Sequence, residues 1–365
     1  MSNRPMPVGK PIAFQGDITK IDPQAFGFFY CKINSPSDIK HPLLQRKIKT
    51  SDGIRTIAGI GTWTGWIFSE EMNNAMKFGY QFEILKGYEF ERGDIFSGYV
   101  NKMYSLRLQY SKGTPMNLIA KLLMNSLYGK FGMRLETTNI DIFDSNNEFE
   151  LDIFNTLLDT LPESIKNWIK LDNFYIIVRK NLIPYSHNES EDFYYGIDVN
   201  IAIASAITSG ARTWMSLLKN SSKFNLYYSD TDSVVIDKQL PSFMVGSNLG
   251  QFKLEYIINK AVFLAPKVYA FVNDRGEEIV KGITKDTLPQ VNFKLLESLL
   301  IKDSSLEFNQ EKWFKKIIEG EITVNEIAYT LKTTSFKRAH IHMDVEDKEI
   351  FINTRPYHYE DIIKN

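Results

Sequence analysis

Cysteine is almost absent from this chain of 365 residues, which contains one, Cys31. A single cysteine forms no internal disulfide, and with five scattered histidines it gives no Cys/His zinc pattern. A chain of this length buries a large core without crosslinks, which excludes the small disulfide-bonded secreted scaffolds. No apolar run approaches the roughly 18 residues that span a bilayer, and the first residues show neither a secretory signal nor a transit-peptide pattern. We therefore expect no membrane association, and function in the compartment where the chain is made.

A net charge of −1 also excludes a strongly basic or acidic chain, so any sign of a charged partner must be local. Residues 95–134 contain six basic residues and no acidic one, whereas residues 136–192 contain twelve acidic and four basic residues. Such asymmetry is typical of an anion-binding element beside a solvated insertion. An ordinary exposed basic helix is the alternative at this point.

The basic segment predicts two helices joined by a short turn. Apolar residues recur at helical spacing from Ile95 to Leu106, and Gly113 then interrupts them. Thr114 and Pro115 begin the second helix, with threonine as the N-cap and proline in the first turn. We expect this helix to end at Gly129, a C-terminal cap. The pair predicts a helical hairpin that projects like a finger.

The rest of the chain mixes helices and strands without regular alternation, which predicts an α+β fold with an antiparallel sheet. Residues 1–94 read as rich in loops, with Trp63 and Trp66 as core residues. A helix rich in small residues is expected over Ile201–Leu218. Other expected elements are a strand over Thr56–Phe68, a helix over Glu70–Phe78, a partly helical Asp152–Leu171, a strand over Phe174–Val178, and helices over Asn292–Leu300 and Glu311–Glu319.

The strongest local signal is the sequence Y-S-D-T-D-S at residues 228–233, which lies between apolar runs and predicts a β-hairpin. Asp230 and Asp232 are two apart, so on an extended backbone both carboxylates face one side. Hard divalent cations such as Mg²⁺ bind carboxylates together with substrate phosphates, and two ions can hold both ends of a phosphoryl transfer. The alternative is a solvated turn in which aspartate caps its own backbone.

A second signal lies on the second helix of the basic segment. Lys121, Asn125 and Tyr128 are spaced by four and three residues and therefore share one helix face. That face offers a cation for a triphosphate, an amide, and an aromatic plane for a base or sugar. Taken alone, the pattern is better explained by a lysine and a tyrosine at the edge of a packed helix.

Together these stretches resemble family B DNA polymerases. Residues 121–129 are similar to that family's motif B, K-x3-N-S-x-Y-G, and residues 228–233 to its motif C, Y-x-D-T-D-S. Lys267-Val268-Tyr269 resembles the K-x-Y motif that holds the primer terminus. The similarity is greatest to the protein-primed branch of phages and linear mitochondrial plasmids, and it covers most of the chain. It implies a right-hand polymerase fold with an antiparallel palm, a helical fingers hairpin and a small thumb.

The resemblance implies an activity and a set of residue roles. The activity is template-directed transfer of deoxynucleotides to a primer 3′-hydroxyl by a two-metal mechanism, with Mg²⁺ as cofactor. Its partners are primer-template DNA, deoxynucleoside triphosphates and a terminal priming protein. The implied roles are metal binding and catalysis for Asp230 and Asp232, nucleotide binding for Lys121, Asn125, Tyr128, Lys102 and Arg107, and DNA binding for Ser126, Gly129, Lys267 and Tyr269.

The resemblance also divides the chain into segments. These are a palm-proximal, terminal-protein-region-like segment (1–94), fingers (95–134), an acidic insertion (135–195), palm with motif C (196–262), and palm edge with thumb (263–365).

The family's motif A, D-x-x-S-L-Y-P, is absent from the sequence, as is the acidic triplet of the 3′–5′ exonuclease. We therefore expect the chain to correspond to the C-terminal portion of such a polymerase and to be inactive alone. The alternative is a non-catalytic remnant that retains DNA binding. The many residues encoded by AT-rich codons favour a mitochondrial location.

Overall fold

The computed structural model describes residues 4–50, 53–133, 138–180, 199–316 and 321–363. The chain divides into two compact units, of which the first comprises residues 1–126, 202–308 and 330–365 and the second residues 127–201 and 309–329. Within the described ranges, no helix has the length and apolar character needed to cross a bilayer.

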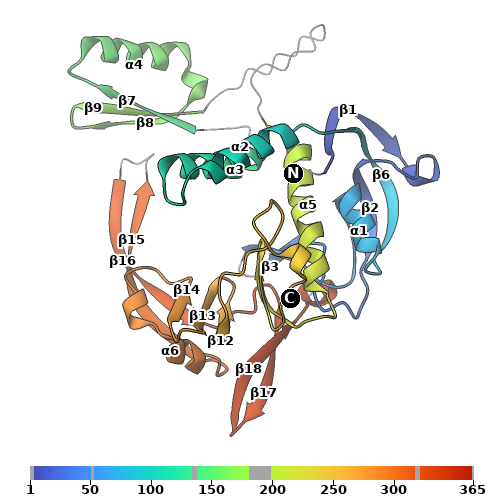
Figure 1. Ribbon diagram of the computed structural model, residues 1–365. Coiled ribbons are helices and arrows are strands. Elements are labelled where there is room, and N and C mark those ends of the chain that lie inside the picture. The colour runs from blue at the N-terminus through green and yellow to red at the C-terminus, as the bar shows by residue number, and fades with distance from the viewer. Residues whose placement is uncertain (1–3, 51–52, 134–137, 181–198, 317–320, 364–365) are drawn as a thin grey trace. The chain divides into compact units, whose positions relative to one another are not determined.

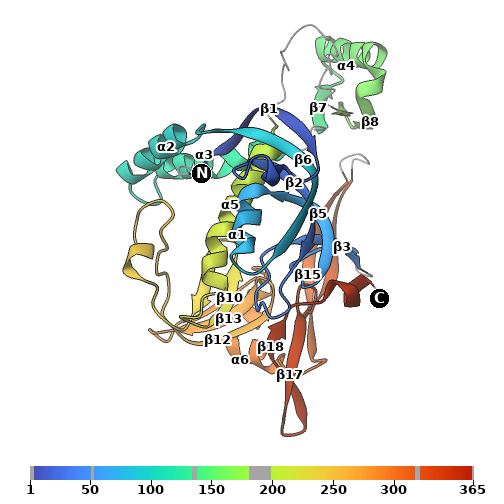
Figure 2. The same cartoon turned by 90° about the vertical axis from the view of Figure 1, so that its right-hand side faces the viewer.

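The first unit begins with a four-stranded antiparallel sheet in the order β1-β6-β2-β5, of which Figure 1 labels β1, β6 and β2, and Figure 2 also β5. Its strands are β1 (Met6–Gln15), β2 (Gly27–Asn34), β5 (Thr62–Phe68) and β6 (Gln81–Gly93). The interpretation of residues 1–94 as rich in loops was wrong. Period-two alternation fixes the buried face, because Phe29, Cys31 and Ile33 on β2 point inward while Tyr30 and Lys32 point outward.

The core beneath this sheet joins residues from both ends of the chain. Helix α1 (Ser69–Met76) packs on the inner face, and the hairpin of β3 (Arg46–Thr50) and β4 (Gly53–Ile57) adds Ile48 and Ile57. From the C-terminal helix α7 (Tyr359–Ile363), the buried Tyr359 hydroxyl donates to the Ile57 carbonyl and accepts from the Gly59 amide. A Cβ on Gly59 would lie 2.8 Å from the Tyr357 carbonyl oxygen, so glycine is needed there. The lone Cys31 belongs to this core, and burial raises the pKa of its thiol to about 12.

The predicted helical hairpin is present as α2 (Ser97–Gln109) and α3 (Pro115–Phe131). Asn117 ties the two helices together, because its side-chain amide donates to the Arg107 and Tyr110 carbonyls at the end of α2. Helix α3 continues two residues past Gly129, so the predicted C-terminal cap was wrong. Nothing lies within 4 Å of a Cβ built on Gly129, and its position in the helix does not demand glycine.

The predicted helix rich in small residues is α5 (Ile201–Lys219), which lies beside α1 (Figure 2). It leads into the hairpin of β10 (Leu226–Asp230) and β11 (Ser233–Ile236). A three-stranded sheet follows, in the order β12 (Ile258–Ala265), β13 (Val268–Asn273) and β14 (Glu278–Lys281), and then helix α6 (Phe293–Ser298).

The C-terminal third contains two further strand pairs. They are β15 (Ser305–Lys316) with β16 (Glu321–Lys332), and β17 (Ala339–Val345) with β18 (Lys348–Arg355). The helix predicted over residues 311–319 was therefore wrong for residues 311–316, which are strand, while residues 317–319 lie outside the described ranges. Local spacing alone favoured a helix here, in which the backbone hydrogen bonds are internal. In the structure, residues 311–316 belong to a strand that pairs with β16 instead. Single 3₁₀ turns are η1 (Ile18–Lys20), η2 (Pro162–Ser164), η3 (Ser242–Met244) and η4 (Leu288–Gln290).

The second unit contains its own small sheet, in the order β7 (Thr138–Asp144), β9 (Phe174–Lys180) and β8 (Ile165–Leu171), with helix α4 (Glu148–Thr160). Asn147 caps α4 by accepting from the Phe149 amide at 3.1 Å. Phe143, Phe154 and Ile177 form its core. The partly helical interpretation of residues 152–171 was correct as far as Thr160, after which the chain turns and enters β8.

Candidate active site and nucleic-acid interface

The two aspartates of residues 228–233 lie at the tip of the predicted hairpin. Asp230 ends β10 and pairs with Ser233 of β11, and Thr231 between them has a left-handed φ of 51°. Asp230 is half-buried and Asp232 is exposed. Asp232 lies in the turn rather than on an extended strand. The expectation that both carboxylates face one side assumed an extended backbone and therefore does not apply. The hairpin itself was predicted correctly.

The K-x-Y residues lie against this hairpin. The Lys267 ammonium is 2.5 Å from Oδ2 of Asp230, although the two residues are 37 positions apart. The Lys267 backbone amide donates to the Tyr228 hydroxyl at 2.9 Å. The Tyr228 ring stacks on Phe263 with centroids 5.1 Å apart and lies 5.0 Å from the Tyr269 ring. These contacts fix the β12–β13 turn next to the aspartates.

The turn that carries Lys267 adopts a demanding backbone conformation. Lys267 has a φ of 69°, which a non-glycine residue adopts at a cost. Gly282, after β14, closes on it so tightly that a Cβ there would lie 2.1 Å from the Lys267 carbonyl oxygen. The bond to Tyr228 and the ion pair to Asp230 both stabilise this conformation.

The electrostatics of the pair follow from this geometry. The hydrogen bond from Lys267 holds the pKa of Asp230 below its ordinary value, against the opposing effect of partial burial. The same bond raises the pKa of Lys267. Burial raises the pKa of the Tyr228 phenol, so that group stays protonated at neutral pH. Asp230 is therefore ionised at neutral pH and paired with the Lys267 ammonium.

These carboxylates suit one Mg²⁺ ion, which proteins bind through one or two carboxylates together with substrate phosphates. The Lys267 ammonium already pairs with Asp230, so Mg²⁺ would compete with it for that carboxylate. Among the described residues, no group of three or more histidine, cysteine or acidic side chains is arranged to hold a metal. The donors seen here fit one ion better than two.

The residues predicted to bind the nucleotide lie on the two helices of the helical hairpin. Lys121, Asn125 and Tyr128 are exposed on α3, and the Tyr128 side chain is 45% exposed. In the described structure, neither Lys121 nor Asn125 forms a hydrogen bond or ion pair with the aspartates of the hairpin. On α2, Lys102 is exposed and Arg107 is half-buried.

Ser126 and Gly129 are also exposed on α3, and the Ser126 hydroxyl donates to the Leu123 carbonyl at 3.3 Å. The Tyr104 hydroxyl of α2 donates to the Ser247 carbonyl in the segment after the hairpin. Within the first unit, this bond links the helical hairpin to that segment.

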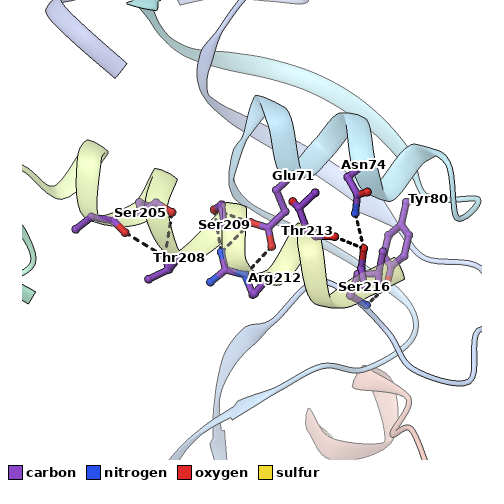
Figure 3. Close-up of polar contacts among 11 residues, drawn as sticks. Glu71, Asn74, Tyr80, Ser205, Thr208, Ser209, Arg212, Thr213 and Ser216 are labelled. Carbon is purple, nitrogen blue, oxygen red and sulfur yellow. Dashed lines mark hydrogen bonds and ion pairs between the residues drawn. The ribbon is translucent and has the colours of Figure 1, made fainter. Parts of the chain in front are cut away.

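A buried polar cluster anchors the helix that delivers the aspartate hairpin, and sequence reasoning missed it (Figure 3). Arg212 of α5 binds Glu71 of α1 through two bonds, Nε to Oε1 at 2.6 Å and Nη2 to Oε2 at 2.8 Å. The Ser209 hydroxyl donates to the same carboxylate at 2.8 Å. One turn further on, the Asn74 amide donates to the Ser216 hydroxyl at 2.9 Å. Burial alone would lower the pKa of Arg212, but its bonds to Glu71 raise it.

The comparisons with known proteins agree with the sequence motifs. The family model described as DNA polymerase type B, organellar and viral, matches residues 1–224. The chain belongs to this family. It is 33% identical over 347 residues to a probable DNA polymerase of Ascobolus immersus, covering 93% of this chain and 27% of that protein. A probable DNA polymerase of Neurospora intermedia is 32% identical over 300 residues, covering 81% of this chain and 29% of that protein. The chain thus spans less than a third of these relatives.

The fold is that of a type-B polymerase. Phi29 DNA polymerase complexed with single-stranded DNA superposes with a TM-score of 0.60 at 17% identity, covering 91% of this chain and 55% of that one. The same polymerase complexed with primer-template DNA gives a TM-score of 0.58 at 17% identity, with the same coverage. The predicted α+β right-hand fold with antiparallel sheets is confirmed. The five-segment division and the individual residue roles stay predictions.

Proposed function

We propose that this chain carries the motif C part of a DNA polymerase active site and acts in template-directed transfer of deoxynucleotides to a primer 3′-hydroxyl. The observation that carries the proposal is the contact of Asp230 with Lys267, which joins two polymerase-like motifs 37 residues apart. Phosphoryl transfer depends chiefly on positioning and on stabilisation of charge. A rigid hairpin that presents carboxylates beside a fixed lysine supplies both.

In this proposal each motif has a distinct task. Asp230 and Asp232 hold Mg²⁺, which when bound neutralises the charge that develops on the transferred phosphoryl group. Lys267 and Tyr269 hold the primer terminus beside them. The exposed face of α3 receives the nucleotide, with Lys121 toward the triphosphate, Asn125 along the base pair and Tyr128 against the sugar and base. Lys102 and Arg107 bind phosphates from α2, and Ser126 and Gly129 lie along the template.

The cellular setting is part of the same proposal. The match to organellar and viral polymerases supports replication of a linear mitochondrial plasmid or a derived element, in the mitochondrion and from a terminal priming protein. The relatives named above come from fungi. Deoxynucleoside triphosphates and primer-template DNA are the proposed ligands.

A second candidate is a non-catalytic remnant that binds DNA. It is favoured by the absence of a D-x-x-S-L-Y-P string from the 365 residues. It is also favoured by the lack, among the described residues, of a third acidic group beside the hairpin. Two-metal transfer needs carboxylates from more than one backbone segment, because a single hairpin cannot surround both ions.

Primer extension separates the two candidates. The chain is fused in frame to a segment that carries motif A, and incorporation of labelled nucleotide into a primer-template is measured. The proposal predicts Mg²⁺-dependent extension that Asp232→Ala abolishes. Asp237→Ala removes an exposed aspartate that lies just after β11 and is bonded to Asn225, so it serves as the matched control and leaves extension unchanged. Binding of primer-template without extension by the fused chain would favour the remnant.

A further inference from the structure

The outward face of the four-stranded sheet carries three aromatic rings, two exposed and one (Tyr30) half-buried, that the polymerase site does not use. Tyr30 on β2, Trp66 on β5 and Tyr88 on β6 form what we call the aromatic face. Trp66 is 50% exposed and Tyr88 is 45% exposed. The expectation that both Trp63 and Trp66 belong to the core was therefore correct only for Trp63, which is 7% exposed.

The rings lie in contact across three adjacent strands. Tyr30 pairs directly with Trp66 in the β2–β5 register, with ring centroids 5.4 Å apart. Trp66 and Tyr88 are nearly parallel, with centroids 5.6 Å apart and planes at 20°. This contact between β5 and β6 spans the strand between them. The result is a continuous aromatic surface on the part of the sheet not covered by α1.

Polar and basic groups border these rings. The Lys86 ammonium lies 5.7 Å from the centre of the Tyr30 ring. Lys32 is the next outward residue of β2. Its ammonium lies 4.0 Å from the Glu83 carboxylate, and its side chain is 58% exposed. The Tyr30 hydroxyl donates to the Thr64 hydroxyl at 3.1 Å. Cations and hydroxyls thus lie within reach of the same aromatic surface.

This combination matches the chemistry of an unpaired nucleic-acid strand. Bases stack on exposed aromatic rings whatever their sequence, and ammonium groups beside the rings bind phosphates. Antiparallel sheets that present aromatic residues on adjacent strands are a recurrent platform for single-stranded nucleic acid. Duplex DNA hides its base faces and cannot use the rings in this way.

We propose that the aromatic face binds single-stranded DNA by stacking unpaired bases on Trp66, Tyr88 and Tyr30. The inference rests on the proposed function only in taking DNA, rather than RNA, as the ligand. Because its contacts are stacking contacts, binding at this face depends less on salt than the phosphate contacts proposed for α2 and α3.

The test is a binding titration with the full 365-residue chain. The probe is fluorescein-labelled oligothymidylate of about 16 nucleotides, the upper end of the span that one stacking domain covers. Anisotropy is followed at low salt and at high salt, where the phosphate contacts are weakened. We expect Trp66→Ala and Tyr88→Ala each to weaken binding at high salt by roughly fivefold to a hundredfold. Trp66→Phe keeps a ring and retains most of the affinity.

Trp313→Ala is the matched control, because Trp313 is 61% exposed but lies on β15, outside this sheet. Circular dichroism verifies that each variant folds. Affinity unchanged in both Trp66→Ala and Tyr88→Ala would overturn the proposal, as would oligouridylate binding equally tightly with the same sensitivity to these variants. It would also be overturned if the variants altered only self-association of the chain, since the face would then be a protein interface. Primer extension by the fused chain is scored separately, so either proposal can fail without the other.

Discussion

The ion pair between Lys267 and Asp230 shows how one residue acts on the candidate site. Lys267 reaches Asp230 from a turn held in a left-handed conformation, and Tyr228 of the same hairpin fixes that turn through its hydroxyl. Motif C and the K-x-Y motif therefore form one unit, in which the charge of one motif sets the protonation of the other.

Replacing Lys267 tests this coupling directly. The lysine holds the pKa of Asp230 below the ordinary 3.8. A carboxyl group whose pKa is lower in the folded than in the unfolded state stabilises the fold at pH values above its unfolded pKa. This stabilisation is lost as the pH falls through its folded pKa. In Lys267→Met we expect the pKa of Asp230 to rise, so that the loss of stability on acidification moves to higher pH. Lys267→Arg keeps the positive charge and therefore keeps the pKa of Asp230 low. The readout is NMR titration of the Asp230 carboxyl carbon, and an identical titration in Lys267→Met would contradict the coupling.

At the scale of elements, a buried ion pair with α1 anchors α5, the helix that leads into the aspartate hairpin. Glu71 is 7% exposed and accepts three hydrogen bonds, two of them from Arg212. A buried carboxylate that loses its cation is costly, because neither water nor another charge replaces it.

We expect an asymmetry between the two partners of this ion pair. Arg212→Ala leaves Glu71 buried and unpaired, and should lower the free energy of unfolding by about 3 kcal/mol, the lower end of the range for buried pairs. Glu71→Ala should cost less, because the Arg212 side chain is 35% exposed and retains contact with water. Urea denaturation of the two variants and of the double variant measures this. Equal losses of unfolding free energy in the two variants would contradict the expected asymmetry. So would losses smaller than that of a surface control such as Lys170→Ala.

The basic hairpin of α2 and α3 gives a second prediction at this scale. Each phosphate contact contributes a slope of about 0.7 to 0.9 to the dependence of log affinity on log salt. Removing two contacts with Lys102→Ala and Arg107→Ala should therefore reduce the slope by about 1.4 to 1.8.

The matched control for the salt slope lies in the other unit. It removes Lys166 and Lys170 from β8, within the acidic segment, and leaves the slope unchanged. A slope unaffected by the α2 variants would show that the fingers assignment is wrong.

Elements with a strong local pattern were predictable from the sequence, and elements that depend on distant partners were not. The hairpin at residues 226–236 and the helix α5 follow from periodicity and small residues. The strand over residues 305–316 depends on pairing with β16, which local spacing does not reveal. The exposure of Trp66 could have been predicted from the sequence. Residues three apart on a strand point to opposite faces, so a buried Trp63 places Trp66 on the outward face. The Glu71–Arg212 pair joins residues 141 positions apart, so no local signal could find it.

At the scale of the whole molecule, the activity of the chain depends on how many metal ligands one hairpin can supply. Asp230 and Asp232 come from a single backbone segment, and the described residues add no third acidic group beside them. We expect a site built this way to bind Mg²⁺ weakly and to leave the attacking hydroxyl without activation. Each tenfold loss in rate corresponds to about 1.4 kcal/mol of transition-state stabilisation, and loss of a bridging ligand removes several such factors.

The most direct measurement of this central claim is template-directed nucleotide addition by the 365-residue chain itself, scored beside its binding to the same primer-template. We expect the chain to bind the DNA and to add no measurable nucleotide with Mg²⁺ and all four deoxynucleoside triphosphates present. Robust incorporation by the chain alone would show that another carboxylate completes the site, and would contradict the account.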